Sequence, residues 1–461
     1  MLFSGIPFLF YFLPVVLILY FLVPWKLKNT VLLLSSLVFY AWGEPMYVFL
    51  MIGTILLFYL CGLAVGNADT QKKKKLWLMV SVVISLGLLG IFKYADFFIG
   101  SFSAATGIAV PLLKLALPIG ISFYTFQCLS YTIDVYRGDT LPQKNIISFG
   151  AYVVLFPQLI AGPIVRYTDV AKELESRQHS REGFYSGLRR FIIGLAKKVL
   201  LANQLGALTE LFRQSGDKSV VFYWMYAIAF TLHIYFDFSG YSDMAIGLGR
   251  IFGFRFPENF DYPYLSRSVT EFWRRWHMTL GGWFRDYVYI PLGGNRVSKS
   301  RWVLNILIVW ALTGLWHGAA WNFVLWGLLY AVFLLLERFF PIPERLPNLL
   351  RRIYVMLIVI LGFVLFNAVD LRQAISDIGG LFGFGGVPFV NSETLYALRS
   401  NAMLFILSLV GCTPLMCRGA RKLEGKAAAA VLEPAVLILL LLLCTAYLVD
   451  GSFNPFLYFR F

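Results

Sequence analysis

Charge is the scarcest property of this 461-residue chain, since aspartate, glutamate, lysine and arginine together make up only 14% of it. A soluble domain carries roughly 25% charged residues, so this composition excludes an ordinary soluble protein. Hydrophobic residues make up 59% and gather in repeated apolar runs. The sequence therefore predicts a polytopic membrane protein with a single integral-membrane domain, residues 1–461.

Several catalytic and binding motifs are also missing. The sequence has no Gly-x-Ser-x-Gly elbow and no Walker loop, which disfavours a hydrolase triad and ATP use by this chain. Its five cysteines and four histidines lack metal-ligand spacing, so neither a metal site nor a permanently bound cofactor is predicted. The absence of an internal repeat disfavours an inverted-repeat transporter.

The net charge of +15 would suggest a nucleic-acid ligand in a soluble protein. Here the basic residues lie in loops between apolar runs, so membrane topology explains them better and no nucleic acid is predicted as a partner. Residues 1–25 have no basic leader region and no small-residue cleavage site. We expect them to form a retained first span in contact with membrane lipid.

A transmembrane helix needs about 20 apolar residues. The sequence offers long candidates at 6–24, 47–66, 77–94, 115–133, 219–238, 319–337, 353–370 and 430–449, and shorter ones at 30–43, 145–164, 186–203, 302–317 and 402–416. We expect an all-α protein with about eleven spans and one or two re-entrant or interfacial helices.

Basic loops predict the orientation of these spans. Lys26, Lys28 and the lysines at 72–75 mark cytoplasmic loops, which places the N-terminus outside. A full crossing by 145–164 would put the basic stretch 166–198 outside. Since 145–164 also contains helix-breaking proline and glycine, we expect it to dip into the membrane and return.

The polar stretch 371–401 has a glycine-rich centre. It is predicted to be an external loop or a short surface helix, and its composition fits a plain linker equally well.

His317 ends the apolar segment 302–316 and is followed almost at once by another apolar run. Desolvation keeps such a histidine neutral, and a neutral imidazole can act as a general base. Gly318 has no side chain and would let a substrate approach closely. A histidine that only packs between helices fits the same pattern. His179 and His233 have no comparable context and are predicted to be non-catalytic.

A second histidine, His277, lies in a stretch whose apolar residues recur at helical spacing. The members of this stripe are Val269, Phe272, Trp273, Trp276, Leu280, Trp283 and Tyr287. Tryptophan and arginine on one amphipathic helix are typical of an anchor at a membrane interface, and composition favours this interpretation. Arg274 and Arg275 could instead hold the phosphates of an acyl donor.

Acidic residues border the preceding apolar run at Asp237 and Asp243. They could orient a histidine, but structural ion pairs are the favoured interpretation. The candidate partners are Arg250, Arg255 and the arginines at 274–275. Two further stretches, 256–261 and 285–296, contain the proline, glycine and asparagine of loops, which often carry function beside a cavity.

In these strings the chain resembles the membrane-bound O-acyltransferase (MBOAT) family, in the branch typified by bacterial alginate O-acetyltransferases. The strings are FPQLIAGP (156–163), DFSGYSD (237–243), PENF (257–260), FWRRWH (272–277), FRDY (284–287), PLGGNR (291–296), WHG (316–318) and PFLYFRF (455–461). The resemblance covers essentially the whole chain and implies a funnel-shaped helical fold that is thin at its centre.

The resemblance also implies roles for individual residues. His317 matches the catalytic histidine of the family, and His277 matches a second histidine that this branch requires or strongly uses. Asp286 or Asp237 would help His277 orient a thioester or move a proton. The supporting or substrate-binding positions are Gln158, Asp237, Tyr241, Asn259, Trp273, Arg274, Arg275, Trp276, Asp286, Asn295 and Trp316.

The implied function is movement of an acetyl group through the bacterial cytoplasmic membrane. Acetyl-CoA would donate it, and a separate serine-hydrolase-like partner outside would esterify alginate, cellulose, peptidoglycan or another polysaccharide. D-Alanyl transfer to teichoic acid shares the histidines but fits PLGGNR and the length after residue 370 less well. A transporter or a non-catalytic scaffold would also fit a chain of this composition, and both functions predict dispensable histidines.

Overall fold

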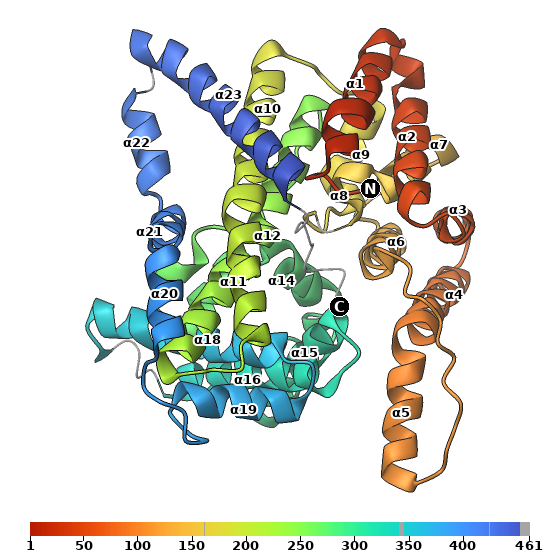
Figure 1. The fold of residues 1–461 in the computed structure, drawn as a ribbon. Coiled ribbons are helices and arrows are strands. Elements are labelled where there is room, and N and C mark those ends of the chain that lie inside the picture. Colours follow the sequence, from red (N-terminus) through yellow and green to blue (C-terminus); the bar gives the residue numbers. More distant parts are fainter. Residues whose placement is uncertain (161, 341–344, 424, 452–461) are drawn as a thin grey trace. The chain divides into compact units, whose positions relative to one another are not determined.

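The structure is a computed structural model that describes residues 1–160, 162–340, 345–423 and 425–451. These residues form helices joined by loops, and no strand occurs among them (Figure 1). The predicted all-α class is therefore confirmed. The string PFLYFRF (455–461) and residue 161 of FPQLIAGP lie outside the described residues.

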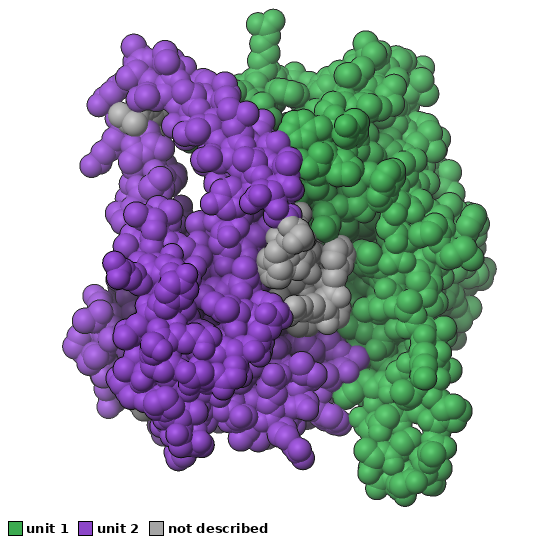
Figure 2. Space-filling view, in the orientation of Figure 1, with its two compact units in different colours: residues 1–191, 241–257 green, residues 192–240, 258–461 purple. Residues whose placement is uncertain are grey.

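The chain divides into two compact units, coloured green and purple in Figure 2. Unit 1 consists of residues 1–191 and 241–257, and unit 2 of residues 192–240 and 258–461. The chain passes between the units three times, within the two long helical segments Arg181–Gln214 and Val220–Ile251 and between Pro257 and Glu258. The expectation of a single domain stays a prediction.

Unit 1 is built mostly from the first half of the chain. Its elements are η1 (Phe8–Phe12), α1 (Leu13–Leu22), η2 (Trp25–Leu27), α2 (Lys28–Gly43), α3 (Tyr47–Gly66), α4 (Gln71–Leu89), η3 (Gly90–Tyr94), α5 (Ala95–Thr106), α6 (Ile121–Arg137), α7 (Ile146–Val154), α8 (Phe156–Leu159), α9 (Tyr167–Glu175), most of α10 (Arg181–Ala196) and the end of α12 (Val220–Ile251).

Unit 2 contains most of the second half of the chain. Besides the end of α10 and the start of α12, it contains η4 (Lys197–Ala202), α11 (Asn203–Gln214), η5 (Pro263–Leu265), α13 (Val269–Arg275), α14 (Met278–Phe284), η6 (Arg285–Tyr289), α15 (Lys299–His317), α16 (Trp321–Phe339), α18 (Asn348–Asn367), α19 (Leu371–Leu381), α20 (Ser392–Ser400), α21 (Ala402–Gly411), α22 (Leu415–Leu423) and α23 (Ala427–Asp450).

Seven helical segments in the described ranges are long and apolar enough to cross a membrane, or eight if the bent pair α20–α21 counts as one span. They are Tyr47–Gly66, Gln71–Thr106, Arg181–Gln214, Val220–Ile251, Trp321–Phe339, Asn348–Asn367 and Ala427–Asp450. The count of about eleven is not confirmed. Some expected spans are short: the 16 residues of α2 extend about 24 Å, less than the ~30 Å hydrocarbon core.

The predicted re-entrant segment 145–164 is not a continuous helix. Helix α7 has nine residues and extends about 14 Å, and the chain then breaks at Leu155 before the four-residue α8. Pro157 lies in the first turn of α8, and the freed backbone N–H of Phe156 donates to the hydroxyl of Ser36 at 3.0 Å. No single continuous helix therefore spans this segment, and the predicted dip into the membrane with a return to the cytoplasmic face stays a prediction.

The polar stretch 371–401 forms two short helices, α19 and α20, joined through the glycine-rich centre. The Asp370 side chain accepts a hydrogen bond at the start of α19, and Asn391 does the same for α20. The external location of the stretch 371–401 stays a prediction.

Helices α15 and α16 pack backbone against backbone, and this contact positions the end of α15. A Cβ atom on Gly314 would lie 2.2 Å from the carbonyl oxygen of Phe323. One on Gly327 would lie 2.1 Å from the carbonyl oxygen of Trp310. Glycine is thus required at both positions, as is common where membrane helices approach closely. His317 is the last residue of α15 and is held by this contact.

Candidate active site around two histidines

The stretch expected to form one amphipathic helix is instead two short helices that meet at His277. Helix α13 ends at Arg275, α14 begins at Met278, and His277 has a left-handed backbone with φ of 45° and ψ of 52°. Left-handed geometry is uncommon outside glycine, asparagine and aspartate, and such strain concentrates at functional sites. Because His277 lies in this break, neither helix sets the direction of its imidazole.

The apolar stripe of this stretch is buried in unit 2, which corrects its interpretation as an interfacial anchor. Trp276 is 3% exposed, and its ring centroid lies 5.1 Å from that of Phe260 and 5.2 Å from that of Phe363. The Trp273 ring lies 4.6 Å from Trp310. These tryptophans pack against protein, so they fix the position of α13 rather than facing lipid.

Asn259 holds His277 in place. Its side-chain Oδ1 lies 3.1 Å from Nδ1 of His277 and also accepts hydrogen bonds from the backbone N–H and the hydroxyl of Thr279. Because a backbone N–H can only donate, the shared Asn259 atom must be the oxygen. Nδ1 of His277 therefore carries the hydrogen. The Asn259 carbonyl also accepts from the N–H of Met278 at 3.0 Å.

This tautomer leaves Nε2 of His277 with its lone pair. Nε2 is buried and has no hydrogen-bond partner among the described residues. Burial lowers the pKa of His277 well below its ordinary value, and the nearby His317 lowers it further. His277 lies in the loop between α13 and α14 and is neutral at physiological pH. It therefore presents a proton acceptor, as a general base requires.

His317 lies in a box of aromatic rings. Its ring centroid lies 5.0 Å from Trp326 and 5.3 Å from Phe366, both edge to face. Trp316 lies 5.0 Å away, and His317 is 7% exposed. The expectation that Gly318 opens a path for substrate is wrong, because the Phe323 ring fills the space where its Cβ would be.

The two predicted catalytic histidines come together in unit 2. Their ring centroids are 6.4 Å apart, and the ring of Trp316 lies 5.8 Å from that of His277. The Phe238 ring packs edge to face on His277 at 4.6 Å. Protonation of either histidine disfavours protonation of the other at this distance, so the pair favours at most one positive charge.

The predicted acidic helpers of His277 are engaged with cations. Asp237 forms a buried ion pair of 2.5 Å with Lys198, with both side chains 2% exposed. Asp286 pairs with its neighbour Arg285 at 2.6 Å. Asparagine rather than a carboxylate thus contacts Nδ1 of His277. The favoured interpretation of Asp237 as an ion-pair partner agrees with this geometry, although the sequence did not indicate Lys198.

The second acidic residue of the same string also forms an ion pair. Asp243 accepts from Arg190 at 2.9 Å within unit 1. Arg190 was not among its candidate partners, since the two residues are separated by more than fifty positions in the sequence.

The remaining predicted site residues divide between the units. In unit 2, Arg275 pairs with Glu271 at 2.9 Å, while Arg274 and Asn295 are exposed. Gln158 and Tyr241 belong to unit 1, whereas both histidines belong to unit 2. Within unit 1, the side chain of Gln158 donates a hydrogen bond to the backbone carbonyl of Tyr152 at 2.7 Å. The acyl-donor role of the arginine pair stays a prediction.

Sequence reasoning missed Phe238, Trp326 and Phe366, which surround the histidines. Apolar residues on apolar helices give no signal of their own. Phe238 follows Asp237 within a string already singled out, and this was the one available clue.

We expect Asn259→Ala to lower acyl transfer about 10²-fold, the lower end of a positioned acid–base contribution. The substitution frees the His277 tautomer and removes the side-chain hydrogen bonds to His277 and Thr279, while the Asn259 carbonyl still accepts from Met278. Initial rates in membranes adjusted to equal protein abundance would measure this. Asn259→Asp keeps the acceptor oxygen and should retain more activity than alanine. Equal rates for wild type and Asn259→Ala would contradict the positioning role.

The chain is similar in sequence to known membrane acyltransferases. The sequence model of a family described as MBOAT, membrane-bound O-acyltransferase family, matches residues 141–369, which contain Asn259 and both histidines. A probable alginate O-acetylase of Azotobacter vinelandii is 38% identical over 100% of both chains. One from Pseudomonas aeruginosa is 44% identical over 84% of this chain and 75% of its own. A peptidoglycan O-acetyltransferase of Helicobacter pylori is 32% identical over 90% of this chain and 87% of its own.

Proposed function

Because the chain belongs to the membrane-bound O-acyltransferase family, we propose that it passes acetyl groups from cytoplasmic acetyl-CoA across the bacterial cytoplasmic membrane for O-acetylation of an exported polysaccharide. The family makes it an acyltransferase, and its apolar helices make it a multi-pass membrane protein. The relatives act on alginate and peptidoglycan by name, which supports a polysaccharide acceptor. We propose an alginate-like polymer, with cellulose or peptidoglycan next.

One observation carries the chemistry: the fixed tautomer of His277, whose buried Nε2 lone pair lies beside His317. In the proposed reaction His317 removes the proton from an acceptor hydroxyl as its oxygen attacks the acetyl carbonyl. The carbon–sulfur bond of the thioester then breaks, and CoA leaves as a thiol after taking up a proton. His277 assists this proton transfer or orients the thioester. Brief transfer of the acetyl group to His317 itself is the second form of the mechanism.

We propose that a separate protein outside the membrane, with a serine-hydrolase-like fold, completes the transfer to sugar hydroxyls. The absence of a Gly-x-Ser-x-Gly elbow from this sequence supports a division of labour between two chains. D-Alanyl transfer is less well supported, since acetyl-transferring relatives match 84–100% of the chain.

The test is to delete the gene and measure ester-linked acetate and ester-linked D-alanine on exported polymers, with a wild-type copy restored as the control. Loss of acetate alone supports the proposal, and loss of D-alanine alone supports D-alanyl transfer. Radiolabelled acetyl-CoA supplied to the cytoplasmic face of sealed membrane vesicles tests the donor. Label that fails to reach the polymer would exclude acetyl-CoA.

The lowered pKa of His277 predicts how activity depends on pH. Only the neutral form of His277 can assist the proton transfer at His317, so this contribution is lost only as pH falls through the folded-state pKa of His277, which lies well below the ordinary histidine value. We therefore expect kcat/KM to stay flat as pH falls from 7.5 to about 6. Rates at fixed abundance across this range would measure it. A fall centred near pH 6.5 would mean that an exposed histidine controls the reaction.

A further inference from the structure

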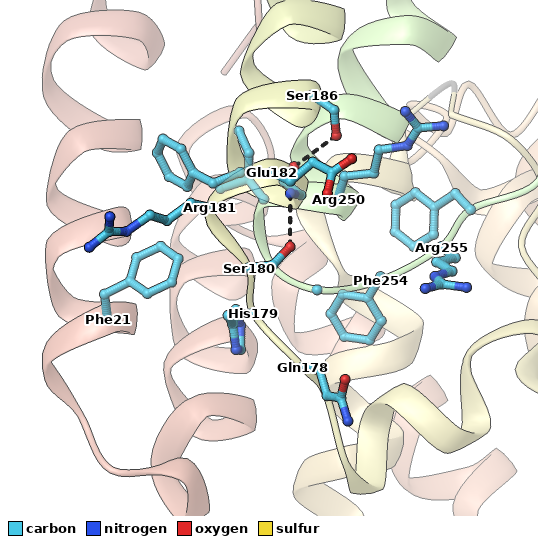
Figure 3. Close-up of a pocket in the computed structure, with 15 residues that line it drawn as sticks. Phe21, Gln178, His179, Ser180, Arg181, Glu182, Ser186, Arg250, Phe254 and Arg255 are labelled. Carbon is cyan, nitrogen blue, oxygen red and sulfur yellow. Dashed lines mark hydrogen bonds between the residues drawn. The ribbon is translucent and has the colours of Figure 1, made fainter.

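Unit 1 contains a pocket of about 820 Å³ that is separate from the histidine pair in unit 2. It is formed by the loop before α10, the first turns of α10, the end of α12 with the residues that follow it, and Phe21 of α1 (Figure 3). None of the functional residues predicted from the sequence lines it. The pocket therefore requires an explanation other than the acyl-transfer chemistry.

The pocket is positively charged. Arg181, Arg250 and Arg255 line it, and Glu182 is its one acidic residue (Figure 3). Arg181 and Arg255 form no ion pair with any residue in the described part of the chain. Burial, and then the charges of Lys28 and Arg177, lower the pKa of His179, so this lining residue adds no charge at neutral pH. The pocket therefore carries an excess of positive charge.

Two features behind and beside the pocket strengthen this positive potential. Arg177 is 7% exposed, and its guanidinium lies 4.4 Å from the ring centroid of Phe254, which lines the pocket. Nη1 and Nη2 of Arg177 are buried and have no hydrogen-bond partner among the described residues. Residues 181–183, the N-terminal turn of α10, also line the pocket, and a helix N-terminus favours anions.

The rim of the pocket is apolar and continues along two helices. Phe21 of α1 and Phe184 of α10 line the pocket, and their ring centroids are 6.1 Å apart. Exposed apolar side chains extend from them along both helices, namely Ile18, Leu19 and Leu22 on α1 and Tyr185 and Leu188 on α10. Such surfaces on a membrane protein suit the acyl chains of lipids.

The position of the rim also fits a membrane interface. Lys28 Nζ lies 5.2 Å from the Phe21 ring centroid and 4.3 Å from that of Tyr20. A basic side chain next to aromatic rings at the end of an apolar helix is typical of the boundary between headgroups and acyl chains. The positive-inside bias assigns this boundary to the cytoplasmic leaflet.

We propose that this pocket binds the phosphate headgroup of an anionic phospholipid from the cytoplasmic leaflet. Arg181 and Arg255 contact the phosphate, and the acyl chains lie along the exposed faces of α1 and α10. Basic pockets between membrane helices recognise anionic headgroups in this way. A soluble phosphate compound offers the same charge but leaves the apolar rim uncovered, and so the rim favours lipid. The inference is independent of the acetyl transfer proposed above.

The test uses the full-length protein in nanodiscs that contain a zwitterionic lipid with a small fraction of phosphatidylglycerol or cardiolipin. Native mass spectrometry counts the anionic lipids that stay bound to the protein after its release from the nanodisc. Loss of about 1 kcal/mol of attraction per arginine corresponds to roughly fivefold weaker binding, so Arg181→Gln/Arg255→Gln is expected to weaken retention about 25-fold. The matched control is Lys72→Gln/Lys75→Gln, which removes the same charge from exposed lysines in the first turns of α4, assigned to the same leaflet.

Selective loss of anionic lipid in the arginine variant, with retention in wild type and control, supports the proposal. Equal retention in all three proteins overturns it. Titration with inorganic phosphate and with a soluble nucleoside diphosphate is the other arm of the test. We expect these two soluble compounds to displace bound lipid only weakly. Tight binding of either compound that depends on the two arginines would overturn the lipid assignment. Arg181→Lys/Arg255→Lys, which keeps the charge, should retain lipid and covers the case in which the glutamine variant fails to fold.

Discussion

His317→Ala is expected to lower polymer acetylation by about 10²–10⁴-fold while leaving the fold intact. The alanine removes the imidazole at the end of α15 but none of the backbone contacts that hold α15 against α16. Ester-linked acetate on exported polysaccharide, measured at equal membrane abundance, gives the size of the loss. Thermal unfolding in detergent reports whether the fold survives.

Glutamine provides the matched control at this position. His317→Gln keeps a polar side chain of similar size among Trp316, Trp326 and Phe366, but an amide cannot act as a base at neutral pH. If His317 performs chemistry, both variants lose acetylation together. Activity retained in glutamine but lost in alanine would mean that the residue only packs. Activity retained in both would favour a scaffold.

Asp237→Asn is expected to cost about 3–5 kcal/mol of stability, because it leaves the Lys198 ammonium buried without its counter-charge. Replacing both partners by apolar residues, as in Lys198→Met/Asp237→Leu, should recover most of this loss, since no buried charge then remains. The denaturation midpoint and the yield of folded protein would show the difference. A double variant as unstable as the single one would mean that other polar contacts of these residues dominate.

An exposed ion pair supplies the control for this experiment. Lys73 and Asp69 are 3.6 Å apart with side chains 62% and 84% exposed. Asp69→Asn should therefore change stability by less than about 1 kcal/mol. If Asp237→Asn instead leaves stability unchanged and abolishes acetylation, Asp237 acts in catalysis and the structural role assigned here is wrong.

The composition and local spacing of the sequence determined the class of this protein. Scarce charge and apolar runs of about 20 residues indicate helices in a membrane, because a helix pairs its backbone groups internally and has the length to cross the hydrocarbon core. Pro157 and glycine predicted a break within 145–164, and α7 and α8 are indeed separate helices, whereas the re-entrant path stays a prediction. The strings around His277 and His317 predicted the family, which the comparisons bear out.

Only the tertiary structure decided how the site is held. Helical periodicity continues through Trp276 and Leu280 and carries no signal of the left-handed turn at His277, which the distant Asn259 helps to hold. The sequence likewise carried no signal that Lys198 pairs with Asp237 or that Phe238 packs on His277. Local spacing specifies which residues share a helix face, whereas contacts between segments far apart in sequence depend on how the helices pack. For the same reason the basic pocket of unit 1, whose lining is drawn from three separate stretches of chain, appeared only in the folded protein.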